Sequence, residues 1–245
     1  SYATLTQEYK FLNADTPDGE FQLFEPRNRE LKLEYDINHY HDKWLIRTNL
    51  DAQNFRLMEC PEFETTRENW KEVIPHREDV LLEDVDLFND YLVVSERIEG
   101  ITQLRIKPWE GEEHYVDFGE KAFMAYTSIN MDFDTQILRL GYTSLTTPNS
   151  VFDYNMQTKE MQLLKEQEVV GGYDKTEYQS ERLFATAKDG TKIPISLVYK
   201  KGFEQDGKQP LLLYAYGSYG HSMDPYFSSI RLSLLDRGFA YAIAH

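Results

Sequence analysis

The chain has 245 residues, and its hydrophobic fraction of 41% and aromatic fraction of 14% suit a folded protein rich in strands. The formal net charge of −16 argues against nucleic acid as a partner, because phosphates attract the opposite sign, and favours cationic ligands at low salt. No apolar run approaches the ~20 residues that a membrane-spanning helix needs, which excludes a membrane span of that kind.

The single cysteine, Cys60, cannot form an internal disulfide, so we expect a reducing compartment. Cys60 lies in the stretch FRLMECPEF, where we interpret it as a buried residue at a strand end and not as a catalytic thiol. The first residues, from Ser1, have neither an initiator Met nor the layout of a signal peptide, and we expect them to come from the middle of a longer chain.

An internal repeat is the strongest organisational signal. Three segments share the order strand, short polar turn, strong strand, turn and third strand, and the landmarks Trp44, Leu92 and Leu138 recur in them at spacings of 48 and 46 residues. A period of ~40 to 50 residues with four short strands per unit is typical of a β-propeller blade. The segments begin at Leu33, Leu81 and Phe123.

The sequence predicts a mostly β protein in which residues 1–165 form a partial β-propeller of about three to four blades. Because a closed ring has at least four blades, we expect an open arc of a larger ring. Residues 166–177 are polar and break the repeat, so we interpret them as an interdomain connector. Residues 178–245 predict a hairpin, a strand, a helix that ends at Gly238 and another strand. An α/β-hydrolase domain begins in this order, and we expect its N-terminal part here, truncated.

A resemblance to a known family is carried by PLLLYAYGSYG, from Pro210 to Gly220, and by FSSIRLSLLDRGFAYAIAH, which follows from Phe227. Both closely resemble the prolyl oligopeptidase family of serine peptidases, and within it the oligopeptidase B branch. The stretches ERIEGITQLRI and ATAKDGTKIPISLVY extend the resemblance along the chain. It implies a cytoplasmic serine endopeptidase that needs no cofactor and hydrolyses short peptides after Lys or Arg. It also implies that the propeller excludes folded proteins.

The sequence lacks the Gly-x-Ser-x-Gly motif around a nucleophilic serine, because Ser218 follows Tyr216 by two positions and Ser222 precedes Asp224 by two. In the resembled family the nucleophile, acid and base all lie beyond the segment that matches His245. We therefore expect this chain by itself to be inactive, and we expect the downstream sequence to restore cleavage.

Tyr216 is the catalytic candidate. The resemblance aligns it with the second Tyr of a Tyr-Gly-Tyr-Gly turn, with Ala215 in place of the commoner Gly, and implies that its hydroxyl donates to the oxyanion of the transition state. The alternative is a buried aromatic residue whose hydroxyl is hydrogen-bonded elsewhere.

Asp224 is the substrate-binding candidate. The resemblance implies that it recognises basic side chains of the peptide, as the first of two acidic positions. Tyr226 occupies the second of these positions, so the strength of a preference for two basic residues stays open. The alternative for Asp224 is a solvated carboxylate in a turn.

Metal binding is not predicted. His39 and His41 have the spacing of a ligand pair, but no third ligand is evident. The acidic segment from Glu110 to Glu120 lacks the order of a calcium loop, and we interpret it as a solvated blade edge.

Two other functions stay open, namely a prolyl-specific relative and a non-enzymatic propeller that binds peptides. The expected partners are short basic peptides, with no nucleic acid and no membrane, and the oligomeric state is unknown.

Overall fold

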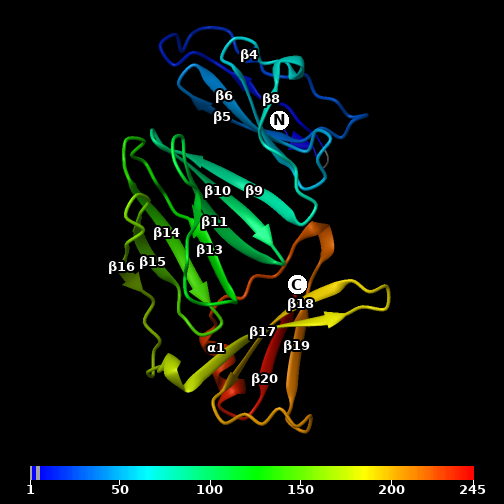
Figure 1. Cartoon of the computed structure of the whole chain (residues 1–245), viewed down its shortest axis with the longest axis vertical. Coiled ribbons are helices and arrows are strands. Elements are labelled where there is room, and N and C mark those ends of the chain that lie inside the picture. The colour runs from blue at the N-terminus through cyan, green and yellow to red at the C-terminus, as the bar shows by residue number, and fades with distance from the viewer. Residues whose placement is uncertain (1, 4–5) are drawn as a thin grey trace. The chain divides into compact units, whose positions relative to one another are not determined.

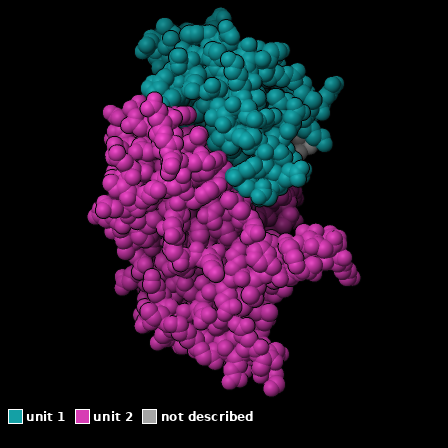
Figure 2. Space-filling view, in the orientation of Figure 1, with its two compact units in different colours: residues 1–87 teal, residues 88–245 magenta. Residues whose placement is uncertain are grey.

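The computed structural model describes residues 2–3 and 6–245 (Figure 1). The chain divides into two compact units, residues 1–87 and 88–245 (Figure 2). Strands make up 45% of the chain and helices 7%, which confirms the prediction of a mostly β protein with the four-stranded antiparallel sheets of a partial propeller.

Unit 1 contains one complete four-stranded blade, whose strands are antiparallel and lie in chain order. These strands are β5 (Tyr35–Tyr40), β6 (Lys43–Thr48), β7 (Arg56–Pro61) and β8 (Lys71–Ile74), with the 3₁₀ turn η1 (Arg67–Asn69) before β8. Two short strand pairs precede the blade, namely β1 (Tyr2–Ala3) with β2 (Thr6–Gln7) and β3 (Lys10–Phe11) with β4 (Gln22–Leu23). The last strand of the unit is β9 (Val80–Leu87).

The core of unit 1 is aromatic. Phe24 stacks on Tyr35 with ring centroids 6.0 Å apart, and Trp70 lies 5.7 Å from the same Tyr35 ring. Cys60 is buried in this cluster near the end of β7, and burial raises the pKa of its thiol to about 11. Because the reactive thiolate is thereby disfavoured, the interpretation of Cys60 as a structural residue is confirmed.

The propeller strands of unit 2 continue the repeat. They are β10 (Tyr91–Ile98), β11 (Ile101–Pro108) and β12 (His114–Tyr115), then β13 (Phe123–Thr127), β14 (Ile137–Ser144), β15 (Ser150–Asn155) and β16 (Met161–Glu166). Strands β13 to β16 form a second complete antiparallel blade. The landmarks Trp44, Leu92 and Leu138 are each the second residue of their strand, in β6, β10 and β14, so the predicted repeat is structurally real.

Alternation along the strands places the core of these blades. Leu104 and Ile106 lie two residues apart on β11, so their side chains leave the same face of the sheet, as do those of Leu138 and Leu140 on β14. All four side chains are fully buried in one hydrophobic cluster. The cluster gives the two neighbouring sets of strands a shared core.

The rest of unit 2 is a mixed sheet of order β17-β18-β20-β19, in which only β19 and β20 are parallel (Figure 1). Its elements are β17 (Tyr178–Thr186), β18 (Lys192–Lys200), β19 (Leu211–Ala215), α1 (Ser229–Leu235) and β20 (Ala240–Ala244). The predicted order of strand, strand, strand, helix, strand is confirmed.

Helix α1 differs in one respect from the apolar pattern. The apolar side chain of Ile230 is exposed, and Arg231 and Leu235 are the buried residues of the helix. The guanidinium of Arg231 lies 4.0 Å from the centroid of the Tyr241 ring, which compensates its burial with a cation–π contact. The helix ends as predicted, because Gly238 adopts a φ of +84° and its N–H donates to the carbonyl of Leu235.

The connection from the propeller strands to the mixed sheet runs from the end of β16 to the start of β17 and contains one 3₁₀ turn, η2 (Lys175–Glu177). Two hydrogen bonds join the β14–β15 region to the mixed-sheet part. The hydroxyl of Tyr173 donates to the carbonyl of Thr146 over 2.6 Å, and the N–H of Phe227 donates to Oγ1 of Thr143 over 3.0 Å. The domain limits at 165/166 and 177/178 stay a prediction. The division into two compact units falls between residues 87 and 88 of the chain. Within the described residues, no helix has the length and hydropathy to cross a membrane.

Candidate functional site

Tyr216 directly follows β19, at the carboxyl end of a parallel strand, where open α/β sheets place their ligand crevices. Its side chain is 45% exposed, and its ring meets that of His221 edge-on at a centroid distance of 6.0 Å. The neighbouring residues of β19, Leu211 to Tyr214, are also exposed, and the role of Tyr216 stays a prediction. Ser218 lies in the 3₁₀ turn η3 (Ser218–Gly220).

Asp224 belongs to the same loop and forms an ion pair. Its Oδ1 accepts from Nη1 of Arg97 on β10 over 2.7 Å, and the side chains are only 15% and 16% exposed. The alternative of a solvated carboxylate is therefore wrong, because the side chain of Arg97 covers it. The pair joins a propeller strand to the loop that also contains Tyr216.

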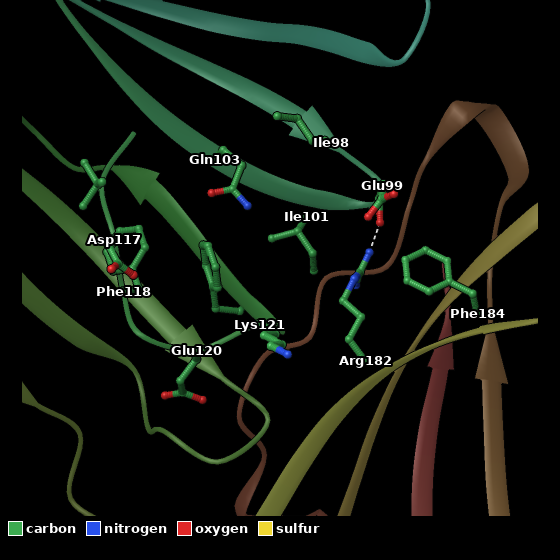
Figure 3. A pocket seen from close by; sticks show the side chains of 12 residues that line it. Ile98, Glu99, Ile101, Gln103, Asp117, Phe118, Glu120, Lys121, Arg182 and Phe184 are labelled. Carbon is green, nitrogen blue, oxygen red and sulfur yellow. Dashed lines mark hydrogen bonds between the residues drawn. The ribbon is translucent and has the colours of Figure 1, made fainter. Parts of the chain in front are cut away.

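The tip of the β10–β11 hairpin, which we define as residues 97–101, contacts the mixed-sheet part at two further points. Gly100 adopts a φ of +83°, and a Cβ at this position would lie 2.6 Å from the Cβ of His245. The guanidinium of Arg182 on β17 donates through Nη2 to the carbonyl of Glu99 (Figure 3). The hairpin tip is thus held by a charge pair, a close backbone approach and a hydrogen bond.

His245 follows β20 and is part of the same polar cluster. Ser196 Oγ accepts from Nη1 of Arg182 over 3.3 Å and lies 2.7 Å from Nε2 of His245. Burial, aided by the positive charge of Arg182, lowers the pKa of His245 to about 4. Burial thus favours the neutral imidazole, whose Nε2 lies within hydrogen-bond distance of the Ser196 hydroxyl. His245 thus directly follows the strand β20 and packs within this cluster.

A pocket of about 440 Å³ opens beside the hairpin tip, within the size range of ligand pockets (Figure 3). Charges of both signs meet in it, from Glu99, Asp117, Lys121 and Arg182, and Phe118 and Phe184 add aromatic surface. Burial lowers the pKa of Arg182 from its ordinary value, although a guanidinium stays charged at neutral pH. Sequence reasoning missed this pocket because its lining comes from three separate stretches of the chain that no local pattern connects.

Most of the acidic segment from Glu110 to Glu120 is exposed, and two of its carboxylates have neighbouring donors. Glu113 pairs with Arg105 over 3.1 Å and lies 3.6 Å from Nζ of Lys107. Glu120 accepts from the hydroxyl of Thr147 over 2.7 Å. These carboxylates have neighbouring donors because the segment packs back onto β11 and the β14–β15 turn. The segment's other acidic residues, Glu110, Glu112 and Asp117, are exposed, which agrees with the interpretation of a solvated blade edge.

The two histidines of the candidate ligand pair, His39 and His41, have different surroundings. Nε2 of His39 lies 3.4 Å from a carboxylate oxygen of Glu62, and its ring packs on Trp44. His41 has a φ of +53° and belongs to the turn after β5. Across residues 2–3 and 6–245, no three or more His, Cys, Asp or Glu side chains are grouped to hold a metal ion.

A sequence profile for the prolyl oligopeptidase N-terminal beta-propeller domain matches residues 2–167, which is more than half of the chain. The chain belongs to the prolyl oligopeptidase family. It is similar to dipeptidyl aminopeptidase BI of Pseudoxanthomonas mexicana, with 44% identity over 245 residues, 99% of this chain and 33% of that protein. It is also similar to protease 2 of Moraxella lacunata, with 34% identity over 244 residues, 100% of this chain and 35% of that protein.

Solved structures of the prolyl oligopeptidase family share the fold. Oligopeptidase B from Trypanosoma brucei with covalently bound antipain, in a closed form, has a TM-score of 0.87 and 31% identity, covering 100% of this chain and 36% of that one. Oligopeptidase B from Leishmania major has a TM-score of 0.85 and 32% identity, covering 100% and 39%. The chain therefore spans about a third of the length of the curated relatives it matches.

Proposed function

We propose that the whole protein is a serine endopeptidase of the oligopeptidase B type, which hydrolyses short peptides on the carboxyl side of Lys or Arg. The similarity to protease 2 and to the two oligopeptidase B structures supports this assignment. In the proposal Asp224 binds a basic side chain of the peptide, and Tyr216 stabilises the oxyanion.

The observation that carries the proposal is the environment of Asp224. Its carboxylate is largely covered and lies 2.7 Å from a guanidinium nitrogen, in the loop that follows β19. A carboxylate in such a partly desolvated place binds a guanidinium or ammonium group more strongly than an exposed one does. The chemistry matches a peptide that carries Arg or Lys.

The proposed role of Tyr216 follows from its position and exposure. Its side chain lies in the loop beyond the end of a parallel strand and is accessible to a ligand. A hydroxyl that is positioned before reaction stabilises the developing oxyanion without reorganisation, an effect of about 3 to 4 kcal/mol per donor. The nucleophile and its base belong to the whole protein and are not assigned to residues of this chain.

We also propose that the propeller limits the size of substrates. The pocket beside the hairpin tip lies between propeller strands and β17, and its volume of about 440 Å³ fits a few residues of peptide. A folded protein would have to unfold locally before it could enter a space of this size.

The test uses the whole protein and N-terminally acylated fluorogenic peptides that end in Arg, Lys or Pro before the reporter. We expect cleavage after Arg and Lys, none after Pro, and loss of activity after reaction with a fluorophosphonate that labels nucleophilic serines. Preferred cleavage after Pro would refute the basic specificity, and full activity after complete labelling would refute the serine mechanism.

A second candidate function is that of an aminopeptidase that releases dipeptides. It is favoured by the 44% identity to dipeptidyl aminopeptidase BI. The two functions differ in their requirement for a free α-amino group. Cleavage of Ala-Arg-reporter with a free N-terminus, together with no cleavage of its acetylated form, would establish the aminopeptidase, whereas equal cleavage of both would establish the endopeptidase.

A further inference from the structure

The carboxylate that we propose for the substrate is already bound by a guanidinium of the protein itself. Nη1 of Arg97 lies 2.7 Å from Oδ1 of Asp224, and each side chain is about five-sixths covered. Arginine is also one of the two side chains that Asp224 is proposed to bind in the peptide. A basic substrate side chain therefore meets a chemically equivalent competitor.

Arg97 is held in place by its own hairpin. The same Nη1 donates to the carbonyl of Gly100 over 3.0 Å, and Arg97 pairs with Thr102 across the β10–β11 register. The hairpin tip in turn rests on His245 through Gly100 and on Arg182 through Glu99. The Arg97 guanidinium thus reaches Asp224 as part of a docked propeller hairpin, and not as a freely moving side chain.

We propose that Arg97 is a specificity-determining residue that competes with the basic side chain of the substrate for Asp224. This inference rests on the proposed function, in which Asp224 binds that side chain. A carboxylate carries one negative charge and balances the charge of one guanidinium. Two cations at the same carboxylate repel each other. Binding of the substrate therefore displaces Arg97 from Asp224.

Two consequences follow from the competition. The selectivity for a basic residue is lower than an unoccupied Asp224 would provide, because one ion pair is lost when the other forms. In addition, displacement of Arg97 removes one of the contacts that hold the hairpin tip on the loop after β19. Recognition of a basic residue and release of the hairpin tip are thereby coupled.

The experiment compares the whole protein with its Arg97→Gln, Asp224→Asn and double variants. The substrates are two acylated peptides cleaved after the same Arg, one with Arg and one with Ala directly before it. The measured quantity is the ratio of kcat/KM for the Arg-Arg peptide to that for the Ala-Arg peptide. We expect Arg97→Gln to raise this ratio about five- to tenfold, as the removal of one competing charge pair does.

The matched control is Arg139→Gln. Arg139 also pairs with an aspartate in unit 2, with 2.8 Å between its Nε and Oδ1 of Asp153, but on a more exposed blade surface. This variant should leave the ratio unchanged. Arg97→Lys retains a cation but lacks the planar guanidinium that reaches both Asp224 and Gly100, so it should give an intermediate ratio. This variant replaces Arg97→Gln in the test if Arg97→Gln fails to fold.

Each outcome separates the two hypotheses. A ratio that stays constant or falls in Arg97→Gln and Arg97→Lys would overturn the competition and make Arg97 a residue that only positions Asp224. A ratio that rises in Arg97→Gln but stays raised in the double variant would overturn it as well, because the effect would not need Asp224. If Asp224→Asn keeps the ratio of the unmodified protein, the role of Asp224 in the proposed function itself is wrong.

Discussion

Gly100, at the tip of the β10–β11 hairpin, packs against His245 so closely that a Cβ on the glycine would lie 2.6 Å from the Cβ of the histidine. Gly100 belongs to a turn of the propeller, and His245 is the residue that follows the last strand of the mixed sheet. The contact leaves no room for any side chain at position 100, and the φ of +83° there also disfavours one. Docking of the hairpin therefore depends on a glycine.

Gly100→Ala should lower the free energy of unfolding of unit 2 by about 2 to 4 kcal/mol, since it combines left-handed strain with overpacking. The matched control is Gly190→Ala, because Gly190 has a φ of +90° but an added Cβ there would meet nothing within 4 Å. It should cost only the strain, about 1 to 2 kcal/mol. Urea titration of both variants measures the difference, and equal losses would show that the contact with His245 adds nothing.

Arg105 on β11 contributes to a buried ion pair with a large effect on stability. Its Nη2 lies 2.6 Å from a carboxylate oxygen of Glu96, which is 1% exposed. Arg105→Met should destabilise the protein by about 3 to 5 kcal/mol, because it leaves a buried carboxylate without its cation. Arg139→Gln, which removes the surface pair of a half-exposed arginine, should cost much less in the same urea titration. A similar cost for both would contradict the role of burial.

We expect the free energy of unfolding to fall in mild acid because of His114. Its Nε2 lies 2.8 Å from the hydroxyl of Tyr154, and burial, followed by the charge of Lys159, lowers the pKa of the imidazole. The unfolded chain therefore takes up a proton first, near the ordinary histidine pKa of about 6.5. This contribution to stability is complete above that pH and is lost as the pH falls through the lower pKa of the folded state.

The measurement is the melting temperature between about pH 7.5 and pH 5, a range around the ordinary histidine pKa. His114→Gln keeps an acceptor for Tyr154 but does not titrate, so its melting temperature should fall less over this range than that of the unmodified protein. Parallel curves would show that His114 does not contribute to the acid sensitivity.

Tyr216→Phe tests the proposed oxyanion donor in the whole protein. Removal of one such donor lowers kcat by about 10² to 10³-fold, and KM should change little, because the hydrogen bond strengthens only in the transition state. Tyr219→Phe is the matched control, since Tyr219 lies three residues further along the loop and is fully exposed. If Tyr216→Phe retains the kcat of the control, Tyr216 is not the donor.

Local patterns predicted much of the fold. The spacing of Trp44, Leu92 and Leu138 identified the repeated blades, because each strand that packs on a core needs apolar residues at alternate positions. The glycine at Gly238 marked the end of the helix, because helix ends require particular backbone conformations. These signals depend on neighbours in the chain and are readable without the fold. The exposure of Ile230 is an exception, because packing of Arg231 on Tyr241 decides which face of α1 is buried.

For the candidate site, the sequence predicted less than it did for the fold. The resemblance of one loop to the prolyl oligopeptidase family pointed to Tyr216 and Asp224. Only the tertiary structure decided that Asp224 is bound by Arg97, which is 127 residues away in the chain, and that Gly100 rests on His245. The pocket beside them combines residues of separate strands and turns. The physical reason is that charge pairing and close packing depend on distances in space, and segments this far apart come together only when the chain folds.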